Sequence, residues 1–331
     1  MTTVLEAINE ALHSCMAESE DVFVLGEDIL DPYGGAFKVS RGLSTSYPDR
    51  VIATPISEAG FIGIGVGMAV QGLRPIVEIM FGDFLTLGAD QLINYAAKMR
   101  WMSADQVRVP LVVRTPMGGR RGYGPTHSQS LEKHFMGAPG LRVVALNHCV
   151  PPADVVRSAV LYDDDPVLLV EHKLLYGLDV RDEADAGEFI CKTSDGHYPV
   201  AHISLADAPK PILTIAAYGY ALHLAMEAVR RLGYEYEVFA DIIAPTQLSP
   251  AQPALLAGHV QATGRLLTVE EAPGEFGWGS ELIASLALSG VTYRRVSRVS
   301  AEDMPIPASG PLEGAVLPQV EDIVQAALAL M

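Results

Sequence analysis

Along the first half of the chain, segments with the helical spacing of apolar residues alternate with short, continuous apolar runs typical of buried strands. Val4, Ile8 and Leu12 recur at helical spacing, which predicts an amphipathic helix over 3–18. Short runs of β-branched and apolar residues then alternate with longer helical patterns, as is typical of an α/β domain with a mostly parallel sheet. The predicted strands are 22–25, 51–53, 75–79, 111–114, 143–146 and 167–170, and the predicted helices are 59–71, 85–100 and 152–161.

The same alternation restarts near residue 212, after a polar stretch in which it fades. We interpret 183–210 as a linker or arm with one hairpin. Beyond it, the predicted strands are 212–216, 236–241, 265–269 and 292–297, and the predicted helices are 220–232, 250–258, 277–288 and 321–330. The pattern therefore predicts two three-layer α/β domains with mostly parallel sheets, at 1–182 and 211–331.

Composition and charge exclude several functional classes. Of the 331 residues, 49% are hydrophobic and 19% charged, which are values of a globular protein. A net charge of −17 argues against nucleic-acid binding as the main activity. The N-terminal segment lacks the pattern of a signal peptide, and no apolar stretch approaches the ~18 residues of a membrane span. Cys15, Cys149 and Cys191 form no CxxC pair, which argues against a disulfide framework or a zinc site and predicts a reduced, cytoplasmic protein.

Two groups of residues could carry chemistry. Glu58 ends the run Thr54-Pro55-Ile56-Ser57-Glu58, just past a predicted strand, where α/β domains bind ligands. The alternative is an acid that only complements the dipole of the following helix. His127 follows a loop rich in glycine and could exchange protons near neutral pH. It could equally be a surface histidine of that loop.

Motifs that bind phosphate groups are missing from the sequence. No GxGxxG lies between a predicted strand and helix, and the P-loop pattern is absent. There is also no Gly-Asp-Gly followed by Asn, the pattern that holds a diphosphate through Mg²⁺ in thiamine enzymes. Gly82-Asp83-Phe84 comes nearest and lacks the third glycine. We therefore expect no Mg²⁺ site in this chain.

Short stretches over nearly the whole chain nevertheless match one family. They are Gly26-Glu27-Asp28, Gly34-Gly35-Ala36-Phe37-Lys38-Val39, Thr54-Pro55-Ile56-Ser57-Glu58, Gly72-Leu73-Arg74-Pro75, His127-Ser128-Gln129-Ser130, Glu171-His172-Lys173-Leu174-Leu175-Tyr176, Glu270-Glu271-Ala272 and Asp303-Met304-Pro305-Ile306-Pro307. The chain resembles the β subunit of the thiamine-diphosphate-dependent 2-oxo acid dehydrogenases, the E1β family. The resemblance implies a pyrimidine-binding domain followed by a transketolase-like C-terminal domain. It also implies an α₂β₂ assembly with an α subunit that holds the diphosphate and Mg²⁺.

The resemblance assigns roles to individual residues. Glu58 would hydrogen-bond N1′ of the cofactor's aminopyrimidine ring and so favour loss of the thiazolium C2 proton. His127 would transfer protons while the acyl unit passes to a lipoyl-bearing E2 or another carrier. Phe84 matches an aromatic position beside the pyrimidine. The remaining positions that match the lining of this pocket are Glu27, Ile56 and Met80.

The chain also departs from the family at several positions. Met80 stands where many relatives have Gln, and Arg120-Arg121 precedes His127. In some relatives a loop near 162–165 helps to hold K⁺, which implies a possible site at Leu111, Ala159, Asp163 and Asp165, although a solvated acidic loop is equally compatible. The leading hypothesis is decarboxylation of a 2-oxo acid, by default pyruvate. The rivals are an E1-like subunit that transfers a two-carbon unit from another donor in biosynthesis, and a catalytically silent scaffold that docks E2.

Overall fold

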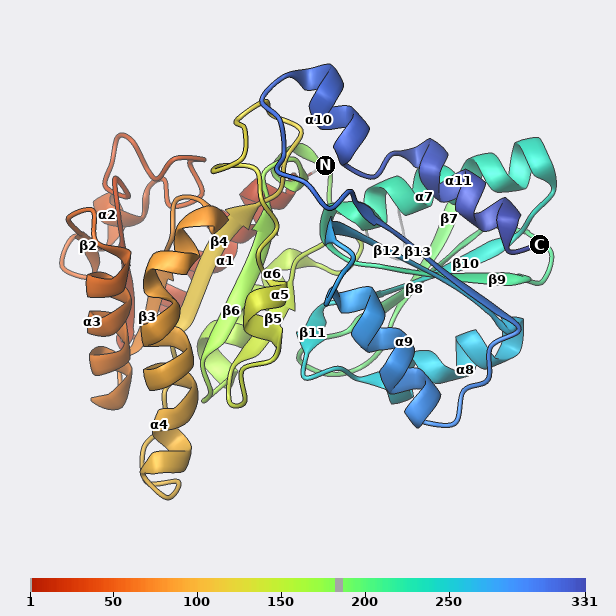
Figure 1. Cartoon of the computed structure of the whole chain (residues 1–331). Helices are drawn as coiled ribbons and strands as arrows, with labels where there is room; N and C mark the ends of the chain where they lie inside the picture. Colours follow the sequence, from red (N-terminus) through yellow and green to blue (C-terminus); the bar gives the residue numbers. More distant parts are fainter. Residues whose placement is uncertain (1, 182–186) are drawn as a thin grey trace.

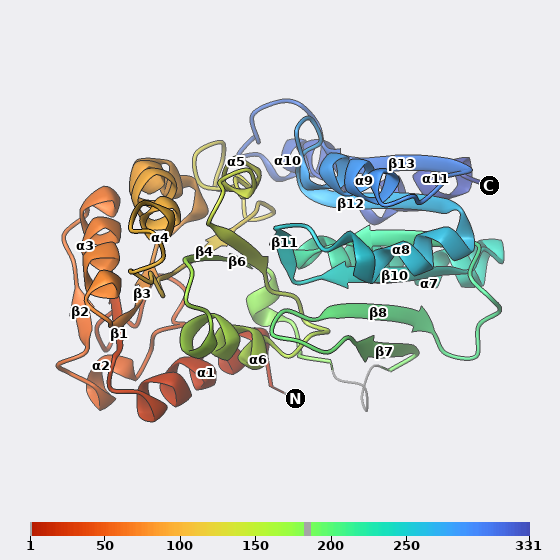
Figure 2. The same cartoon turned by 90° about the horizontal axis from the view of Figure 1, so that it is seen from below.

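The computed structural model describes residues 2–181 and 187–331 and arranges them as two sheets with helices on their faces (Figures 1 and 2). The first sheet has the strand order β11-β5-β6-β4-β3-β1-β2. Its strands from the first half of the chain run parallel. They are β1 (Val22–Gly26), β2 (Val51–Ala53), β3 (Arg74–Glu78), β4 (Val112–Met117), β5 (Arg142–Ala145) and β6 (Val167–His172).

Six α-helices accompany the first sheet within the described residues. They are α1 (Val4–Glu18), α2 (Leu43–Ser46), α3 (Glu58–Val70), α4 (Ala97–Met102), α5 (Lys133–Met136) and α6 (Pro152–Arg157). Helix α1 begins with a capping box, in which the Thr3 hydroxyl accepts from the Glu6 N–H and Glu6 accepts from the Thr3 N–H. The predicted helix over 85–100 is instead a 3₁₀ segment (Gly82–Gly88), a π-helical segment (Gln91–Ala96) and α4.

The second sheet has the order β13-β12-β9-β10-β8-β7. Strands β9 (Leu213–Ala217), β10 (Ala240–Pro245), β12 (Arg265–Pro273) and β13 (Arg295–Ala301) are parallel. Figure 1 shows α7 (Gly219–Tyr236) and α11 (Val320–Ala329) on one face of this sheet, and α8 (Pro253–Thr263) and α9 (Trp278–Leu288) on the other. The sheet and its two helical layers make the three-layer architecture that the pattern predicts.

The segment that the sequence predicts as a linker contains the expected hairpin. Strands β7 (Phe189–Thr193) and β8 (Val200–Leu205) pair with each other, and β8 pairs antiparallel with β10. The hairpin therefore extends the second sheet rather than standing apart as an arm. The boundary predicted at residue 182 lies outside the described residues, and the boundary near 211 stays a prediction.

The second half of the chain also returns to the first sheet. Strand β11 (Gln247–Ser249) follows β10 directly and pairs antiparallel with β5. The sequence pattern did not predict β11, because a three-residue strand is too short to have a period. The predicted strand 236–241 begins later, since α7 continues to Tyr236 and Glu237 ends it with a left-handed backbone (φ 56°). In the described ranges, no helix combines the length and the apolar character needed to cross a membrane.

Candidate active site

The parallel strands of the first sheet bring several sequence-predicted residues to one edge. Strand β3 lies between β1 and β4, and β1 lies between β3 and β2, so the carboxyl ends of these four strands are neighbours. Glu27 follows β1, the run from Thr54 to Glu58 follows β2, and Met80 follows β3 within two residues. The loop that carries His127 follows β4. This edge is where α/β sheets bind their ligands.

Two carboxylates lie close together at this edge. Glu58 opens α3 and is buried, and Glu27 is buried beside it. Burial raises the pKa of the Glu27 carboxyl, and the nearby carboxylates of Glu58 and Asp28 raise it further. Glu27 Oε1 and the Thr54 hydroxyl have no hydrogen-bond partner among the described residues. Buried polar groups are normally hydrogen-bonded, so these unpaired atoms are what a pocket for a polar ligand would present.

His127 stands in an aromatic pocket. Its ring packs edge-on against Phe81 and Phe84, with centroid distances of 5.0 and 5.3 Å. Phe81 and Phe84 themselves lie 5.9 Å apart, and Tyr123 is 5.9 Å from Phe81. The Thr126 hydroxyl is 3.0 Å from His127 Nδ1. These contacts hold the imidazole half-buried, in contrast to the freely exposed loop histidine of the alternative interpretation.

The other two predicted lining residues are placed differently. Ile56 lies on the connection between β2 and α3 and is 85% exposed. Met80 is half-buried and follows the end of β3 in the sequence. Sequence reasoning missed Phe81, although it stands three residues before Phe84. That spacing, on a turn that follows a strand, was the signal that could have identified it.

The glycine-rich loop before His127 is tied to the second half of the chain. Glu271 of β12 accepts hydrogen bonds from the Gly119 N–H (2.8 Å) and from Arg120 Nε (3.2 Å). Glu313 of α10 (Gly310–Val316) accepts from the N–H groups of Arg120 (2.7 Å) and Gly122 (3.0 Å). Arg120 therefore anchors the loop, while Arg121 remains exposed on it.

Glu271 makes several of the contacts that hold the glycine-rich loop in place. Burial alone would raise its pKa, but His172, Arg120 and the Gly119 N–H together outweigh burial and lower the pKa to about 2. His172 Nε2 lies 3.2 Å from Glu271 Oε1. Gly118 must be glycine, because its φ is 87° and a Cβ there would lie 2.0 Å from His172 Nε2. The position of the loop thus depends on residues of both halves of the chain.

Lys173 is a second cation that sequence reasoning did not single out. It lies just past β6, is buried, and donates a hydrogen bond of 2.7 Å to the Gly118 carbonyl. Its Nζ is 5.4 Å from the centre of the Phe81 ring, next to the aromatic pocket. Burial lowers the pKa of Lys173 to about 8, although Asp83 and Glu271 oppose this effect.

A buried ion network lies in the strands beneath the edge. Arg114 of β4 donates two hydrogen bonds, both 2.7 Å, to Glu171 of β6, and it also pairs with Glu78 of β3. The Tyr176 hydroxyl donates to Glu171 at 2.5 Å. Arg114 is 1% exposed, so this network is shielded from solvent and links three adjacent strands.

The possible potassium site is already rich in protein contacts. The Leu111 carbonyl accepts from the Val167 N–H. Arg74 Nη1 donates to the Asp163 carbonyl (3.0 Å), and the Asp163 carboxylate receives Arg142 Nε (2.6 Å). Asp165 pairs with Arg100 at 2.8 Å, and Ala159 lies in a buried π-helical segment. Guanidinium groups thus occupy the oxygens of Asp163 and Asp165, and the potassium ion stays a prediction that these contacts do not favour.

Two family profiles match the sequence, and solved structures share the fold. A profile described as "Transketolase, pyrimidine binding domain" matches residues 1–178, and one described as "Transketolase, C-terminal domain" matches residues 204–323. Among solved structures, the chain is similar to one titled "Split gene transketolase, inactive beta4 tetramer". The TM-score is 0.75 at 18% identity, with 100% of this chain and 98% of the other covered. At that identity the likeness supports the fold alone.

Curated relatives match along the whole chain. The chain is 38% identical to "Pyruvate dehydrogenase E1 component subunit beta-1, mitochondrial" of Oryza sativa subsp. japonica, over 98% of this chain and 85% of the relative. It is 37% identical to the subunit beta-1 of Arabidopsis thaliana, over 98% and 88%. It is 35% identical to "Pyruvate dehydrogenase E1 component subunit beta" of Gracilaria tenuistipitata var. liui, over 100% of both chains.

These relatives correct the predicted location. We predicted a cytoplasmic protein, and this prediction is wrong by the comparison, because the rice, Arabidopsis and rat relatives are named as mitochondrial proteins. The cysteine argument could not have distinguished the two. Free, scattered cysteines argue against an oxidising compartment and do not say which other compartment holds the protein.

The matches confirm both the fold class and the family that the sequence motifs indicated. They span the two predicted α/β units, and the relatives agree in their names over nearly the full length. The chain belongs to the family of E1 β subunits of the thiamine-diphosphate-dependent 2-oxo acid dehydrogenases.

Proposed function

We propose that this chain is the β subunit of a pyruvate dehydrogenase E1 component, which decarboxylates pyruvate and transfers the acyl group to a lipoyl carrier. The observation that carries the proposal is that the buried Glu58 and the aromatic pocket of His127 both follow strands at the same edge of the first sheet. The names of the full-length relatives support pyruvate as the substrate. An α subunit is the expected partner, in an α₂β₂ assembly.

The residues present fit the pyrimidine half of thiamine diphosphate. Bound thiamine diphosphate supplies an electron sink for loss of CO₂ from a 2-oxo acid. Within this chain, Glu58 is a buried acceptor whose carboxylate makes no side-chain hydrogen bond to the described residues, so it is free to bind a ring nitrogen. We infer that Glu58 holds the proton at N1′ of the pyrimidine and that Glu27, with its raised pKa, lines the same pocket.

His127 is suited to the later proton transfers. It lies on a loop at the pocket, and the hydroxyl of Thr126 contacts one ring nitrogen, Nδ1. We infer that Nε2 faces the reacting acyl group and its acceptor. Phe81 and Phe84 would exclude water from the imidazole and keep it oriented.

The α subunit is proposed to complete the site. The sequence has no Gly-Asp-Gly motif followed by Asn, so we assign the diphosphate and its Mg²⁺ to the α chain. The lipoyl acceptor is proposed to be carried by an E2 component.

A biosynthetic two-carbon transfer is the second candidate. Arg121 is exposed on the loop before His127, and Lys173 lies buried beside Phe81, so positive charge adjoins the pocket. Such charge would suit an anionic donor other than a simple 2-oxo acid. A silent scaffold subunit is disfavoured, since both Glu58 and His127 are present in suitable surroundings.

Co-expression with a cognate α subunit tests the proposal. The purified complex would be assayed with thiamine diphosphate, Mg²⁺ and an artificial electron acceptor against pyruvate, branched 2-oxo acids and ketose donors. We expect turnover with pyruvate that exceeds turnover with the other donors. Turnover with a ketose donor and none with any 2-oxo acid would favour the second candidate.

A further inference from the structure

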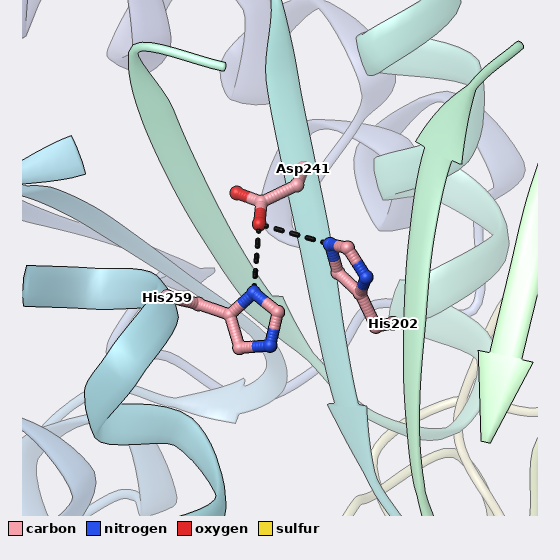
Figure 3. A group of neighbouring side chains, drawn as sticks. All are labelled: His202, Asp241 and His259. Carbon is pink, nitrogen blue, oxygen red and sulfur yellow. Dashed lines mark hydrogen bonds and ion pairs between the residues drawn. The ribbon is translucent and has the colours of Figure 1, made fainter. Parts of the chain in front are cut away.

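A cluster of two histidines and one aspartate lies in the second sheet, far along the chain from the residues of the proposed active site. Figure 3 shows His202, Asp241 and His259 with both imidazole rings turned toward one carboxylate oxygen. His202 Nε2 and His259 Nδ1 each lie 3.1 Å from Asp241 Oδ2. The two rings are 4.2 Å apart, centroid to centroid.

The fold positions the three side chains independently. His202 on β8 pairs across the sheet with Ile243 of β10, and Asp241 lies two residues away from Ile243. Residues two apart on a strand share a face, so His202 and Asp241 point to the same side of the sheet. His259 comes from α8, the helix that covers this face (Figure 1). Two strands and a helix therefore converge at the cluster.

The position of His259 on α8 is also fixed by a contact with strand β9. The backbone carbonyl of His259 accepts a hydrogen bond of 3.3 Å from the Thr214 hydroxyl. Thr214 is the neighbour of Asp241 in the pairing of β9 with β10. Thr214, which lies beside Asp241 in the sheet, thus also fixes the turn of α8 that carries His259. Hydrogen bonds from neighbouring residues commonly orient the side chains that bind a metal.

One oxygen of the buried Asp241 carboxylate is unpaired in the described part of the chain. Asp241 is 2% exposed, and its Oδ1 has no hydrogen-bond partner in the described part of the chain. The two imidazoles hydrogen-bond Oδ2, and the Thr214 hydroxyl adds a further side-chain contact to the carboxylate. A buried carboxylate is expected to be paired or to bind a cation, and here two imidazole nitrogens face one oxygen of a carboxylate whose other oxygen is unpaired among the described residues.

The geometry suits a small transition metal ion. One ligand atom from each of the three residues lies within 4.8 Å of the others. Zinc binds nitrogen and oxygen at about 2.0–2.1 Å, which places ligand atoms of a tetrahedral site about 3.3 Å apart. The two nitrogen–oxygen separations of 3.1 Å are close to this value, and the two nitrogens lie within 4.8 Å of each other, so metal binding would draw the imidazoles together. Both histidine side chains are 34% exposed, so an ion and its water ligands can reach the site.

We propose that His202, Asp241 and His259 form a binding site for a divalent transition metal, with Zn²⁺ the best match to two imidazoles and one carboxylate. Imidazole favours zinc, copper and nickel, whereas Mg²⁺ favours oxygen ligands. Three protein ligands leave a coordination position for water. The ion would join β8, β10 and α8, at a site separate from the Mg²⁺ assigned to the α subunit. The scattered cysteines argued against a zinc site, whereas the three ligands proposed here include no cysteine and lie far apart in the sequence.

Titration calorimetry on the metal-free, tag-free full chain tests the proposal. We expect Zn²⁺ to bind with one-to-one stoichiometry and micromolar or tighter affinity, and Co²⁺ to give the visible absorption of a tetrahedral site. His202→Gln and His259→Gln should each weaken Zn²⁺ binding by more than ~10-fold. Loss of a residue that only supports a metal ligand already costs about that much, and a direct ligand should cost more. Mg²⁺ should not compete.

His197→Gln is the matched control, because His197 is exposed on the turn between β7 and β8 and lies outside the cluster. It should bind Zn²⁺ like the wild type. Zn²⁺ should raise the Tm of the wild type and of His197→Gln, but not that of His259→Gln. The proposal is overturned if the wild type binds Zn²⁺ no better than His259→Gln, or if His197→Gln weakens binding as much as the cluster variants do.

Discussion

Glu58 and His127 differ in how the structure prepares them for chemistry. Glu58 is buried at the first turn of α3, beside the buried Glu27. His127 is held by aromatic contacts on a loop. We therefore assign them separate steps, with Glu58 needed to activate the cofactor and His127 needed for later proton transfer.

Replacing Glu58 should affect the first step. In the α₂β₂ complex, Glu58→Gln should lower turnover at least ~10²-fold, the usual scale for a positioned acid–base group. Assembly should survive, because Gln keeps the size of the side chain at a pocket. Steady-state kinetics with saturating cofactor measures the loss. A turnover within a few-fold of the wild type would remove Glu58 from the mechanism.

Replacing His127 should separate the two steps. His127→Ala should impair acyl transfer to the lipoyl or carrier acceptor and leave deuterium exchange at C2 of the bound cofactor much less affected. Glu58→Gln should impair both. If His127→Ala abolishes C2 exchange as fully as the Glu58 variant, the division of roles is wrong. If it changes neither rate, His127 is a loop residue without a catalytic role.

At the scale of elements, the buried network of Arg114 links β3, β4 and β6 directly below the pocket. The three strands end at the edge where Met80, the glycine-rich loop and Lys173 begin. The network is therefore placed to hold these strand ends in register. A buried ion pair adds little net stability, but removal of one partner leaves charges without compensation.

Arg114→Met tests this inference. It leaves Glu78 and Glu171 buried without their cation, so the free energy of unfolding should fall by about 3 kcal/mol or more. Arg108→Met is the matched control, since among the described residues Arg108 pairs only with the exposed Asp105 and its loss should barely move the urea midpoint. Equal, small shifts of the midpoint in both variants would contradict a structural role for the network.

At the scale of the whole molecule, periodicity predicted the two α/β units because long elements repeat their pattern often enough to be recognised. It missed β11, whose three residues are too few to show a period. It also took the segment 85–100 as one helix, although the chain changes from 3₁₀ to π to α geometry there. Side-chain spacing does not distinguish these forms well over one or two turns.

In the candidate site, too, local sequence patterns could be recognised and contacts between distant residues could not. Glu58 and His127 could be identified because they lie in short motifs that follow strands. The anchor of the loop by Glu271 and Glu313 could not, since these residues are 151 and 193 positions from Arg120 along the chain. The cluster of His202, Asp241 and His259 was hidden for the same reason, because only the pairing of β8 with β10 and the packing of α8 bring its members together.

We propose that this chain supplies the pyrimidine half of a cofactor site that an α subunit completes. Titration calorimetry of thiamine diphosphate, with and without Mg²⁺, into the purified chain and into the co-expressed α₂β₂ complex tests it most directly. We expect tight, Mg²⁺-dependent binding to the complex and weak binding to the chain alone. Tight, Mg²⁺-dependent binding to the chain alone would contradict it.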